Sequence, residues 1–293
     1  MVVAWRHLLV DRETFACEYN ENSRYLVLGL PMDWTTTYVP GTRFAPQRIR
    51  HTSCNIELYS ITTRRVLEGK GYVDLGDVFL PNGDIMASVK NIEQVVRGIL
   101  DEYPDRKYFF IGGEHLVTLP LIRALSKEIE SIIVFDAHGD LRDEYLGVKY
   151  SHATVMRRII EETKLPIYFI GTRALSEEEH AYIEANNIVV VDPLEINRVD
   201  EVVKEAVANK KVYISIDMDA IDPSYAPGVS NPEPLGLTPL QLLEITEKIV
   251  EYSRSIVGVD IVEVNPLRDV NDVTSILAAK ILVEITGLLD RFD

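Results

Sequence analysis

The stretch SIIVFDAHGD, residues 131–140, joins an apolar run directly to two aspartates and a histidine. The run SIIV, residues 131–134, is rich in β-branched residues and is typical of a buried strand. Beyond it, Asp136, His138 and Asp140 occupy alternate positions, and alternate side chains of an extended segment point to the same side. The stretch therefore predicts a buried strand that ends in three polar side chains on one face.

Seven other runs have the same apolar, β-branched or aromatic character and are bounded by turn-forming residues. The eight predicted strands are YLVLGLP (25–31), GYVDLGDVF (71–79), KYFFIGG (107–113), SIIVFDA (131–137), PIYFIGT (166–172), NIVVVDP (187–193), KVYISID (211–217) and SIVGVDIVEV (255–264). Helical periodicity lies between most of them, at 87–102, 177–186, 199–208 and 239–252. Strands that alternate with helices predict a parallel α/β sheet. No linker or repeat divides the chain, so we expect one domain over residues 1–293.

Composition and charge restrict the partners that the protein can have. Its 293 residues include 46 acidic and 30 basic side chains, a net charge of −16, which repels nucleic acid and attracts small cations. The start MVVAWRHLLVDRE does not resemble a signal peptide, and no apolar stretch approaches the roughly 18 residues of a membrane span. The two cysteines, Cys17 and Cys54, are too few for a disulfide framework and suit a reducing compartment. These features predict a cytoplasmic protein with neither a nucleic acid nor a membrane as partner.

A second segment repeats the pattern of the first. SIDMDAIDP, residues 215–223, places Asp217 and Asp219 after a β-branched run, and His115 follows the strand-like KYFFIGG. Taken singly, each motif is more often a solvated turn, a helix cap or an ordinary histidine than a ligand set. Together, acidic groups converging at one sheet edge would repel one another unless cations neutralised them. The predicted metal ligands are His115, Asp136, His138, Asp140, Asp217 and Asp219.

This set of two histidines and four aspartates suits two divalent ions that share carboxylates. Oxygen and imidazole ligands without thiolate fit Mn²⁺ better than a structural zinc, although affinity alone does not exclude Zn²⁺, Co²⁺ or Ni²⁺. Two such ions can hold a bridging hydroxide at neutral pH. The sequence therefore predicts a metal-dependent enzyme.

Five motifs occur in the order and spacing of the ureohydrolases, the family of arginase and agmatinase. They are GGEH (112–115), DAHGD (136–140), SH (151–152), SIDMDAIDP (215–223) and VEVNP (262–266), and residues 29–50 resemble the amino-terminal segment of that family. The resemblance implies a three-layer α/β/α fold with an eight-stranded, mostly parallel sheet. It also implies a dinuclear site with two Mn²⁺ per chain and assembly as a homotrimer or homohexamer.

The resemblance assigns roles to individual residues. It implies that one ion is held by His115, Asp136, Asp140 and Asp217, and the other by Asp136, His138, Asp217 and Asp219, with Asp136 and Asp217 as bridges. Asp140 would also aim the attacking hydroxide, His152 would shuttle a proton, and Glu263 would bind the guanidinium of the substrate. Without the resemblance, His152 reads as a surface imidazole near a helix start, and Glu263 reads as a buried acid paired with a base.

The stretch VKYSHA, residues 148–153, takes the place of the SGNLHG of arginases, and it resembles agmatinases together with MRR at 156–158. This favours agmatine, a cationic guanidino compound, hydrolysed to urea and putrescine. Departures from the family pattern at Gly139, Ala153, 229–231 and Leu235 leave arginine, guanidinobutyrate, another guanidino acid or guanidine open.

Two other kinds of protein remain as alternatives. A dinuclear phosphoesterase would use Arg142, Lys149 and Arg173 to bind phosphate. A catalytically silent regulatory homologue would be expected to lose metal ligands, and all six are present here.

Overall fold

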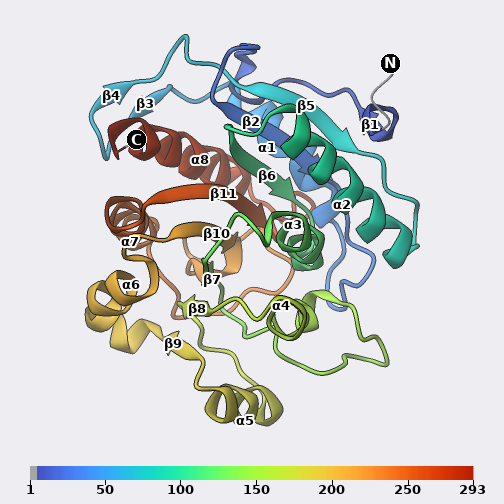
Figure 1. Cartoon of the computed structure of the whole chain (residues 1–293), viewed down its shortest axis with the longest axis vertical. Coiled ribbons are helices and arrows are strands. Elements are labelled where there is room, and N and C mark those ends of the chain that lie inside the picture. Colours follow the sequence, from blue (N-terminus) through green and yellow to red (C-terminus); the bar gives the residue numbers. More distant parts are fainter. Residues whose placement is uncertain (1–4, 293) are drawn as a thin grey trace.

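Eight parallel strands form the centre of the structure, a computed structural model that describes residues 5–292 (Figure 1). The strands of the main sheet are β1 (Leu9–Val10), β2 (Tyr25–Leu30), β5 (Val73–Val78), β6 (Lys107–Gly112), β7 (Ser131–Phe135), β8 (Ile167–Ile170), β9 (Val189–Val191), β10 (Lys211–Asp217) and β11 (Ser255–Val262). Their order across the sheet is β1-β5-β2-β6-β11-β10-β7-β8-β9. A separate antiparallel pair consists of β3 (Tyr59–Ser60) and β4 (Arg65–Val66).

The main sheet has nine strands within residues 5–292, so the prediction of eight is one strand short. The additional strand, β1, contains only two residues and pairs antiparallel with β5, where Leu9 lies opposite Val78. A two-residue strand has no periodicity for a sequence pattern to reveal. The eight strands that the sequence predicts are all present and parallel to one another, which confirms the α/β fold.

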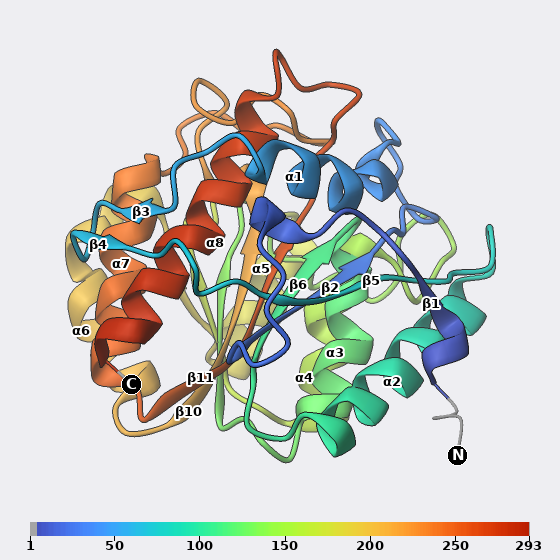
Figure 2. The same ribbon diagram turned by 90° about the horizontal axis from the view of Figure 1, so that it is seen from above.

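Helices cover both faces of the sheet and complete three layers (Figures 1 and 2). They are α1 (Ala45–Ser53), α2 (Ile85–Glu102), α3 (Thr118–Leu125), α4 (Val155–Thr163), α5 (Glu177–Asn186), α6 (Val199–Val207), α7 (Pro239–Tyr252) and α8 (Val273–Phe292). Helices α1, α6, α7 and α8 pack on one face, and α2 to α5 pack on the other. None of the helices between residues 5 and 292 is long and apolar enough to cross a membrane.

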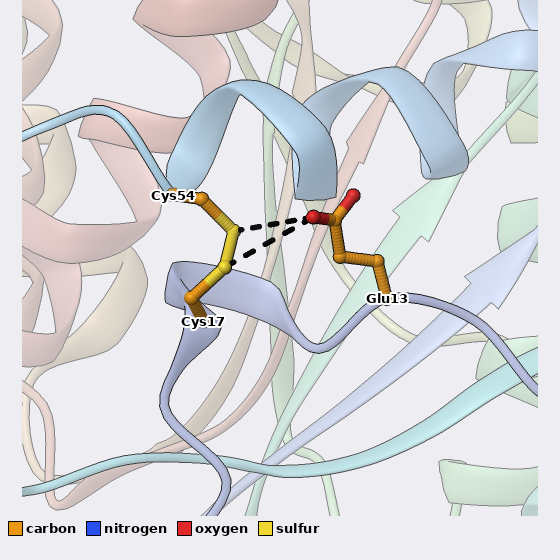
Figure 3. Close-up of side chains that lie close together, drawn as sticks. All are labelled: Glu13, Cys17 and Cys54. Atoms are coloured by element: carbon orange, nitrogen blue, oxygen red, sulfur yellow. Dashed lines mark hydrogen bonds between the residues drawn. A yellow bond between two sulfur atoms is a disulfide. The ribbon is translucent and has the colours of Figure 1, made fainter.

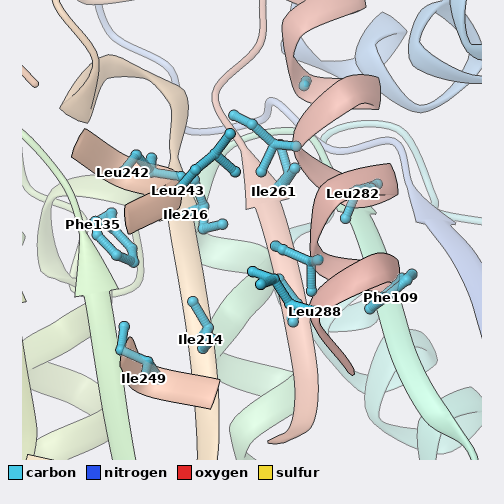
Figure 4. Close-up of a cluster of buried hydrophobic side chains, with 14 of the residues drawn as sticks. Phe109, Phe135, Ile214, Ile216, Leu242, Leu243, Ile249, Ile261, Leu282 and Leu288 are labelled. Atoms are coloured by element: carbon cyan, nitrogen blue, oxygen red, sulfur yellow. The ribbon is translucent and has the colours of Figure 1, made fainter. Parts of the chain in front are cut away.

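Side chains of the central strands alternate between two hydrophobic cores. In β2, Tyr25 and Val27 enter the core under α1 and α8, whereas Leu26 and Leu28 enter the core under α2 and α3. Figure 4 shows part of the first core, in which side chains of the sheet meet those of α7 and α8. Burying one large apolar side chain contributes about 1.5–3 kcal/mol. These two cores therefore hold the sheet that carries the polar strand ends.

The two cysteines form a disulfide that joins the segment around Cys17 to the end of α1 at Cys54 (Figure 3). Their Cα atoms lie 5.1 Å apart although 37 positions separate them in the sequence. The cysteine count thus loses its value as an argument for a reducing compartment. The Glu13 carboxylate lies 3.7 Å from Cys54 Sγ, but disulfide sulfurs are not the thiolates that bind metal ions.

Candidate metal centre

The carboxyl ends of four adjacent strands, β6, β11, β10 and β7, meet at one place on the sheet edge. The predicted site residues lie at or just beyond these ends: His115 after β6, Glu263 after β11, Asp217 in β10 and Asp136 after β7. Ligands of open α/β sheets bind at this edge. The fold therefore brings together motifs that are up to 148 positions apart in the sequence.

A first group of carboxylates surrounds His115. Its Nδ1 lies 3.1 Å from Asp136 Oδ2, 3.1 Å from Asp140 Oδ2 and 3.4 Å from Asp217 Oδ2. All four residues are buried. Among residues 5–292, neither His115 Nδ1 nor Asp136 Oδ2 has a hydrogen-bond partner. Two buried, unpaired ligand atoms directed at each other fit a cation between them.

A second group adjoins the first and shares Asp136 with it. His138 Nδ1 lies 3.0 Å from Asp219 Oδ2 and 3.7 Å from Asp136 Oδ1. Asp136 thus presents one carboxylate oxygen to each histidine. Three residues of each group have ligand atoms spaced closely enough to hold a metal ion: His115, Asp136 and Asp140 in the first, and Asp136, His138 and Asp219 in the second. The result is a buried His/Asp cluster that can hold metal, and its donor types are those that divalent ions such as Mn²⁺ accept.

The electrostatics of the cluster also favour bound cations. Burial raises the pKa of Asp217 well above its ordinary value, and the charges of Asp219 and Asp136 raise it further. Burial, followed by the charge of Asp136, raises the pKa of Asp140 to about 7. Carboxylates crowded in this way resist ionisation unless positive charge is added.

The orientation of His115 is set from the side opposite the carboxylates. Ser215 Oγ lies 2.6 Å from Asp260 Oδ1 and 3.1 Å from His115 Nε2. Asp260 is buried, and a hydroxyl has one proton to donate. Ser215 donates it to Asp260 and accepts from His115 Nε2–H. The unprotonated Nδ1 of His115 is then left for the carboxylate group, as a metal ligand requires.

His138 has polar neighbours at its outer nitrogen. The side-chain amide of Asn231 lies 2.9 Å from His138 Nε2, and Glu233 Oε1 lies 3.8 Å away. If Nδ1 is a ligand, Nε2 carries the proton and needs an acceptor. The Asn231 atom at 2.9 Å is the amide nitrogen, so the amide supplies this acceptor only when it is flipped to exchange its nitrogen and oxygen. Asn231 is one of the positions that depart from the family pattern.

The turn after β7 differs from the extended segment that the sequence predicts. The strand ends at Phe135, and Asp140 has a left-handed backbone conformation with φ 52°. Its carbonyl accepts hydrogen bonds from Met156 and Arg157 near the start of α4. Asp140 therefore reaches the first group because the chain turns back onto α4, and simple side-chain alternation does not explain its position.

A cavity of about 590 Å³ opens above the cluster. It is lined by metal-ligand candidates and by other residues beyond the strand ends, among them Thr36, Tyr38, Arg142, Tyr145, His152, Glu179, Asn231, Glu233 and Glu263. This volume is within the range of small-molecule sites.

His152 forms part of the cavity wall, at the start of the short helix His152–Thr154. The Tyr145 ring contacts it edge-on, with ring centroids 5.9 Å apart. Burial, together with the charges of His138 and His115, lowers the pKa of His152 to about 4. The structure thus places this imidazole in the cavity and excludes the surface position considered from the sequence.

Glu263 is buried at the end of β11 and lines the same cavity. Its Oε1 accepts a hydrogen bond from the backbone N–H of His115 at 2.8 Å, and its own backbone is left-handed, with φ 63°. Burial raises the pKa of Glu263 well above its ordinary value, and the neighbouring charge of Glu114 adds to the effect. In the described part of the chain no arginine or lysine forms an ion pair with it, unlike the buried pair considered from the sequence.

The basic residues that a phosphoesterase would need are otherwise engaged or absent from the cavity. Arg173 donates hydrogen bonds to the carbonyls of Pro234, Gly171, Asp219 and Glu233, at 2.7–2.9 Å. Arg142 lies 3.7 Å from the Glu179 carboxylate, over the Tyr145 ring. Lys149 is not among the lining residues.

Several residues around the site were not identified from the sequence, namely Thr35, Glu114, Ser215, Asn231 and Asp260. One of them leaves a signal: Asp260 interrupts the apolar run SIVGVDIV, and a buried charge in a central strand needs partners. The other four leave none, because a serine within a strand and a threonine, glutamate or asparagine beyond a strand end are ordinary in a sequence.

A buried His/Asp cluster at the carboxyl edge of a parallel α/β sheet, below a cavity, defines a metal-dependent enzyme. The family model of the arginase family matches residues 23–287. An agmatinase of Bacillus cereus is 38% identical over 90% of this chain and 91% of its own length. A guanidinobutyrase of Pseudomonas aeruginosa is 34% identical over 89% of this chain and 85% of its own.

A solved structure of similar fold also bears a ureohydrolase name. The crystal structure of the agmatine ureohydrolase of Thermoplasma volcanium matches with a TM-score of 0.84 and 33% identity, over 97% of this chain and 96% of that one. The chain therefore belongs to the arginase family. It is an agmatinase-like ureohydrolase, a metal-dependent amidinohydrolase that acts on a guanidino compound.

Proposed function

We propose that the protein hydrolyses agmatine to urea and putrescine at a centre of two Mn²⁺ ions held by the six predicted ligands. The observation that carries the proposal is the position of Asp136, whose two oxygens face His115 and His138 in adjoining groups. A shared carboxylate is what a pair of ions requires. The proposal includes a cytoplasmic location and assembly as a homotrimer or homohexamer. Light scattering on the purified protein would measure the mass of the assembly.

The charges of the cavity support a substrate with a cationic far end. Besides the metal-ligand candidates and His152, the lining within residues 5–292 includes the acids Glu179, Glu233 and Glu263 and one arginine, Arg142. Arg142 already faces Glu179. An ammonium group therefore meets more favourable charge than the carboxylate of arginine or guanidinobutyrate does.

The side chains suit the steps of guanidine hydrolysis. When bound, two divalent ions would lower the pKa of water and make it a nucleophile at neutral pH. Glu263 would hold the guanidinium through a charge-assisted hydrogen bond. Asp140 would accept a hydrogen bond from the attacking water and aim it at the guanidinium carbon. His152, on the cavity wall, would take up a proton that the attacking water releases and pass it to the leaving amine.

Urea release tests the proposal directly. The purified, Mn²⁺-loaded protein would be given agmatine, arginine, guanidinobutyrate and guanidine in separate reactions, with Asp136→Asn as the control. We expect the highest kcat/KM with agmatine and no measurable release by the variant. A higher kcat/KM with a guanidino acid would contradict the substrate, and p-nitrophenyl phosphate cleavage without urea would contradict the reaction.

The same experiment, with the metal content measured, distinguishes an active enzyme from a catalytically silent regulatory homologue. Two Mn²⁺ per chain with rapid turnover would exclude it. A metal content well below two, with activity that depends on an added partner, would support it instead.

A further inference from the structure

The hydroxyl of Thr35 contacts both a buried carboxylate and the His152 imidazole. Thr35 Oγ1 lies 2.9 Å from Glu114 Oε2 and 3.2 Å from His152 Nδ1. It also accepts a hydrogen bond from the backbone N–H of His152 at 3.0 Å. Thr35 and Glu114 are buried, and His152 faces the cavity. The hydroxyl thus connects an acid that faces no solvent with the candidate proton shuttle.

The number of protons at these contacts determines the direction of each hydrogen bond. A hydroxyl donates one proton and accepts at two lone pairs. Glu114 Oε2 also accepts from the backbone N–H of Thr35, at 2.7 Å. If the hydroxyl donated to His152, its lone pairs would face this acceptor oxygen at 2.9 Å. The hydroxyl therefore donates to Glu114 and accepts twice from His152, once from the backbone N–H and once from Nδ1–H.

The backbone holds Thr35 over Glu114. Glu114 N–H donates to the carbonyl of Met32 at 2.7 Å. A Cβ at Gly113 would lie 2.0 Å from the same carbonyl oxygen, so only glycine permits this close approach. Asp33, on the same loop, accepts from Gly41 N–H at 2.9 Å and forms an ion pair with Arg43. The loop is therefore braced from two sides.

Glu114 is also costly to bury. Within residues 5–292 its Oε1 has no hydrogen-bond partner. A buried acceptor without a partner loses its hydrogen bonds to water and gains none from the protein. The other oxygen of the same carboxylate, Glu114 Oε2, accepts the hydrogen bond that sets the direction of the Thr35 hydroxyl.

We infer that Glu114, acting through Thr35, is a positioning residue that fixes His152 as the Nδ1–H tautomer and leaves Nε2 to exchange a proton with the substrate. The inference rests on the proposed function, in which His152 serves the leaving amine. Ser215 and Asp260 hold His115 by the same device, but there the tautomer exposes Nδ1. The two hydroxyls thus give two histidines opposite tautomers.

The tautomer can be read directly by ¹⁵N NMR. The protein would be labelled with ¹⁵N-histidine and loaded with diamagnetic Zn²⁺, and the His152 signals would be assigned by their loss in His152→Asn. We expect Nδ1 to be protonated and Nε2 unprotonated in the natural sequence. Protonation of Nε2 would overturn the inference, and this measurement needs no variant at Thr35 or Glu114.

Kinetics of the Mn²⁺-loaded variants supply the second test. Thr35→Val keeps the shape of the side chain and removes the hydroxyl. We expect kcat to fall about 10- to 100-fold, part of the 10²–10⁴ that general acid–base catalysis contributes, with KM nearly unchanged. Thr35→Ser should restore kcat and the tautomer. As a matched control, Thr246→Val removes a buried hydroxyl whose hydrogen bond, within residues 5–292, is to Leu242 O of the same helix α7. This variant should leave both kcat and the tautomer unchanged.

A double-mutant cycle tests the link between the two residues. Glu114→Met should lower kcat about as much as Thr35→Val, and the double variant should be no slower than either single one. Additive losses, or an unchanged His152 tautomer in Thr35→Val, would overturn the inference. Absence of urea release by the natural sequence would instead count against the proposed function, since the NMR result does not depend on turnover.

Discussion

The backbone N–H of His115 donates a hydrogen bond to the Glu263 carboxylate at 2.8 Å. The residues follow adjacent strands, β6 and β11. The carboxylate proposed to bind the guanidinium is thereby tied to the first residue of the candidate metal-ligand set. If Glu263 binds the guanidinium and His115 binds a metal ion, as proposed, the same pair of strands would set the positions of substrate and metal.

Replacing Glu263 by Gln should separate substrate binding from metal binding. The amide oxygen can still accept from His115 N–H, but the charge that faces the guanidinium is lost. Hydrogen bonds to charged groups contribute about 1.5–3 kcal/mol, so kcat/KM should fall roughly 10- to 150-fold. Mn²⁺ content should stay the same. Glu251→Gln, an exposed substitution in α7, removes an equal charge and should change neither value.

Removal of the Ser215 hydroxyl should weaken metal binding. In Ser215→Ala the His115 Nε2–H loses its acceptor, and loss of such a partner typically costs 10- to 100-fold in metal affinity. Ser131 is the matched control, since its hydroxyl is buried and has no hydrogen-bond partner in the described residues. Calorimetric titration with Mn²⁺ should show weaker binding for Ser215→Ala and unchanged binding for Ser131→Ala. Equal affinities would mean that Ser215 does not orient His115.

Stability without metal should depend on pH through the crowded carboxylates. The raised pKa of Asp217 and of Asp140, the latter about 7, means that the folded state keeps protons that the unfolded chain releases near pH 4. The folded state then binds more protons, so its stability falls as pH rises from about 4 to about 7. Thermal unfolding of the metal-free protein across this range should show a falling Tm.

Added Mn²⁺ should reverse this trend, because the ions replace the protons. The increase in Tm on Mn²⁺ addition should be larger near pH 8 than near pH 5. Asp136→Asn should show little increase at either pH. A Tm that rises with pH in the metal-free natural sequence would contradict the assignment of these carboxyl groups.

The fold should depend on Arg50, which lies away from the cavity. Its fully buried guanidinium pairs with Asp74 at 2.8 Å and with Asp77 at 2.6 Å. Arg50→Met removes the buried cation between the two carboxylates and leaves Asp77 only its ion pair with Arg12. Loss of one partner of a buried pair costs about 3–5 kcal/mol, so the free energy of unfolding should fall by about that amount. Arg48→Met, on the same helix, breaks an exposed pair with Asp272 and should cost about 1 kcal/mol or less. Urea denaturation would compare the two.

Local sequence patterns were sufficient to predict most elements of the fold. The runs at 25–31 and 211–217 form β2 and β10. A short, continuous apolar run is typical of a parallel strand that is buried on both faces of the sheet. Their order across the sheet was not predictable in this way, since it depends on contacts between distant segments. The Cys17–Cys54 disulfide was missed for the same reason.

The candidate site was predictable where several chemical groups recur at strand ends. Asp136, His138 and Asp217 were predicted as metal ligands because their motifs occur together in the sequence. The structure brings these motifs together at one sheet edge. The residues that orient these ligands were not predictable in the same way. The contact of Ser215 with both His115 and Asp260 depends on the pairing of β10 with β11, which no local pattern encodes.

The left-handed backbone at Asp140 and Glu263 limits how this site can change by mutation. Such a conformation is tolerated by glycine and, among other residues, best by asparagine and aspartate, whereas β-branched residues are strongly disfavoured. A library of all substitutions at either position would therefore be filtered first by whether the chain can still turn there. At Asp140 the aspartate is itself one of the tolerated residues, so Asp140→Asn isolates the loss of charge. At Glu263 many inactive variants would report a displaced backbone, and only those that keep the turn would report on the reaction.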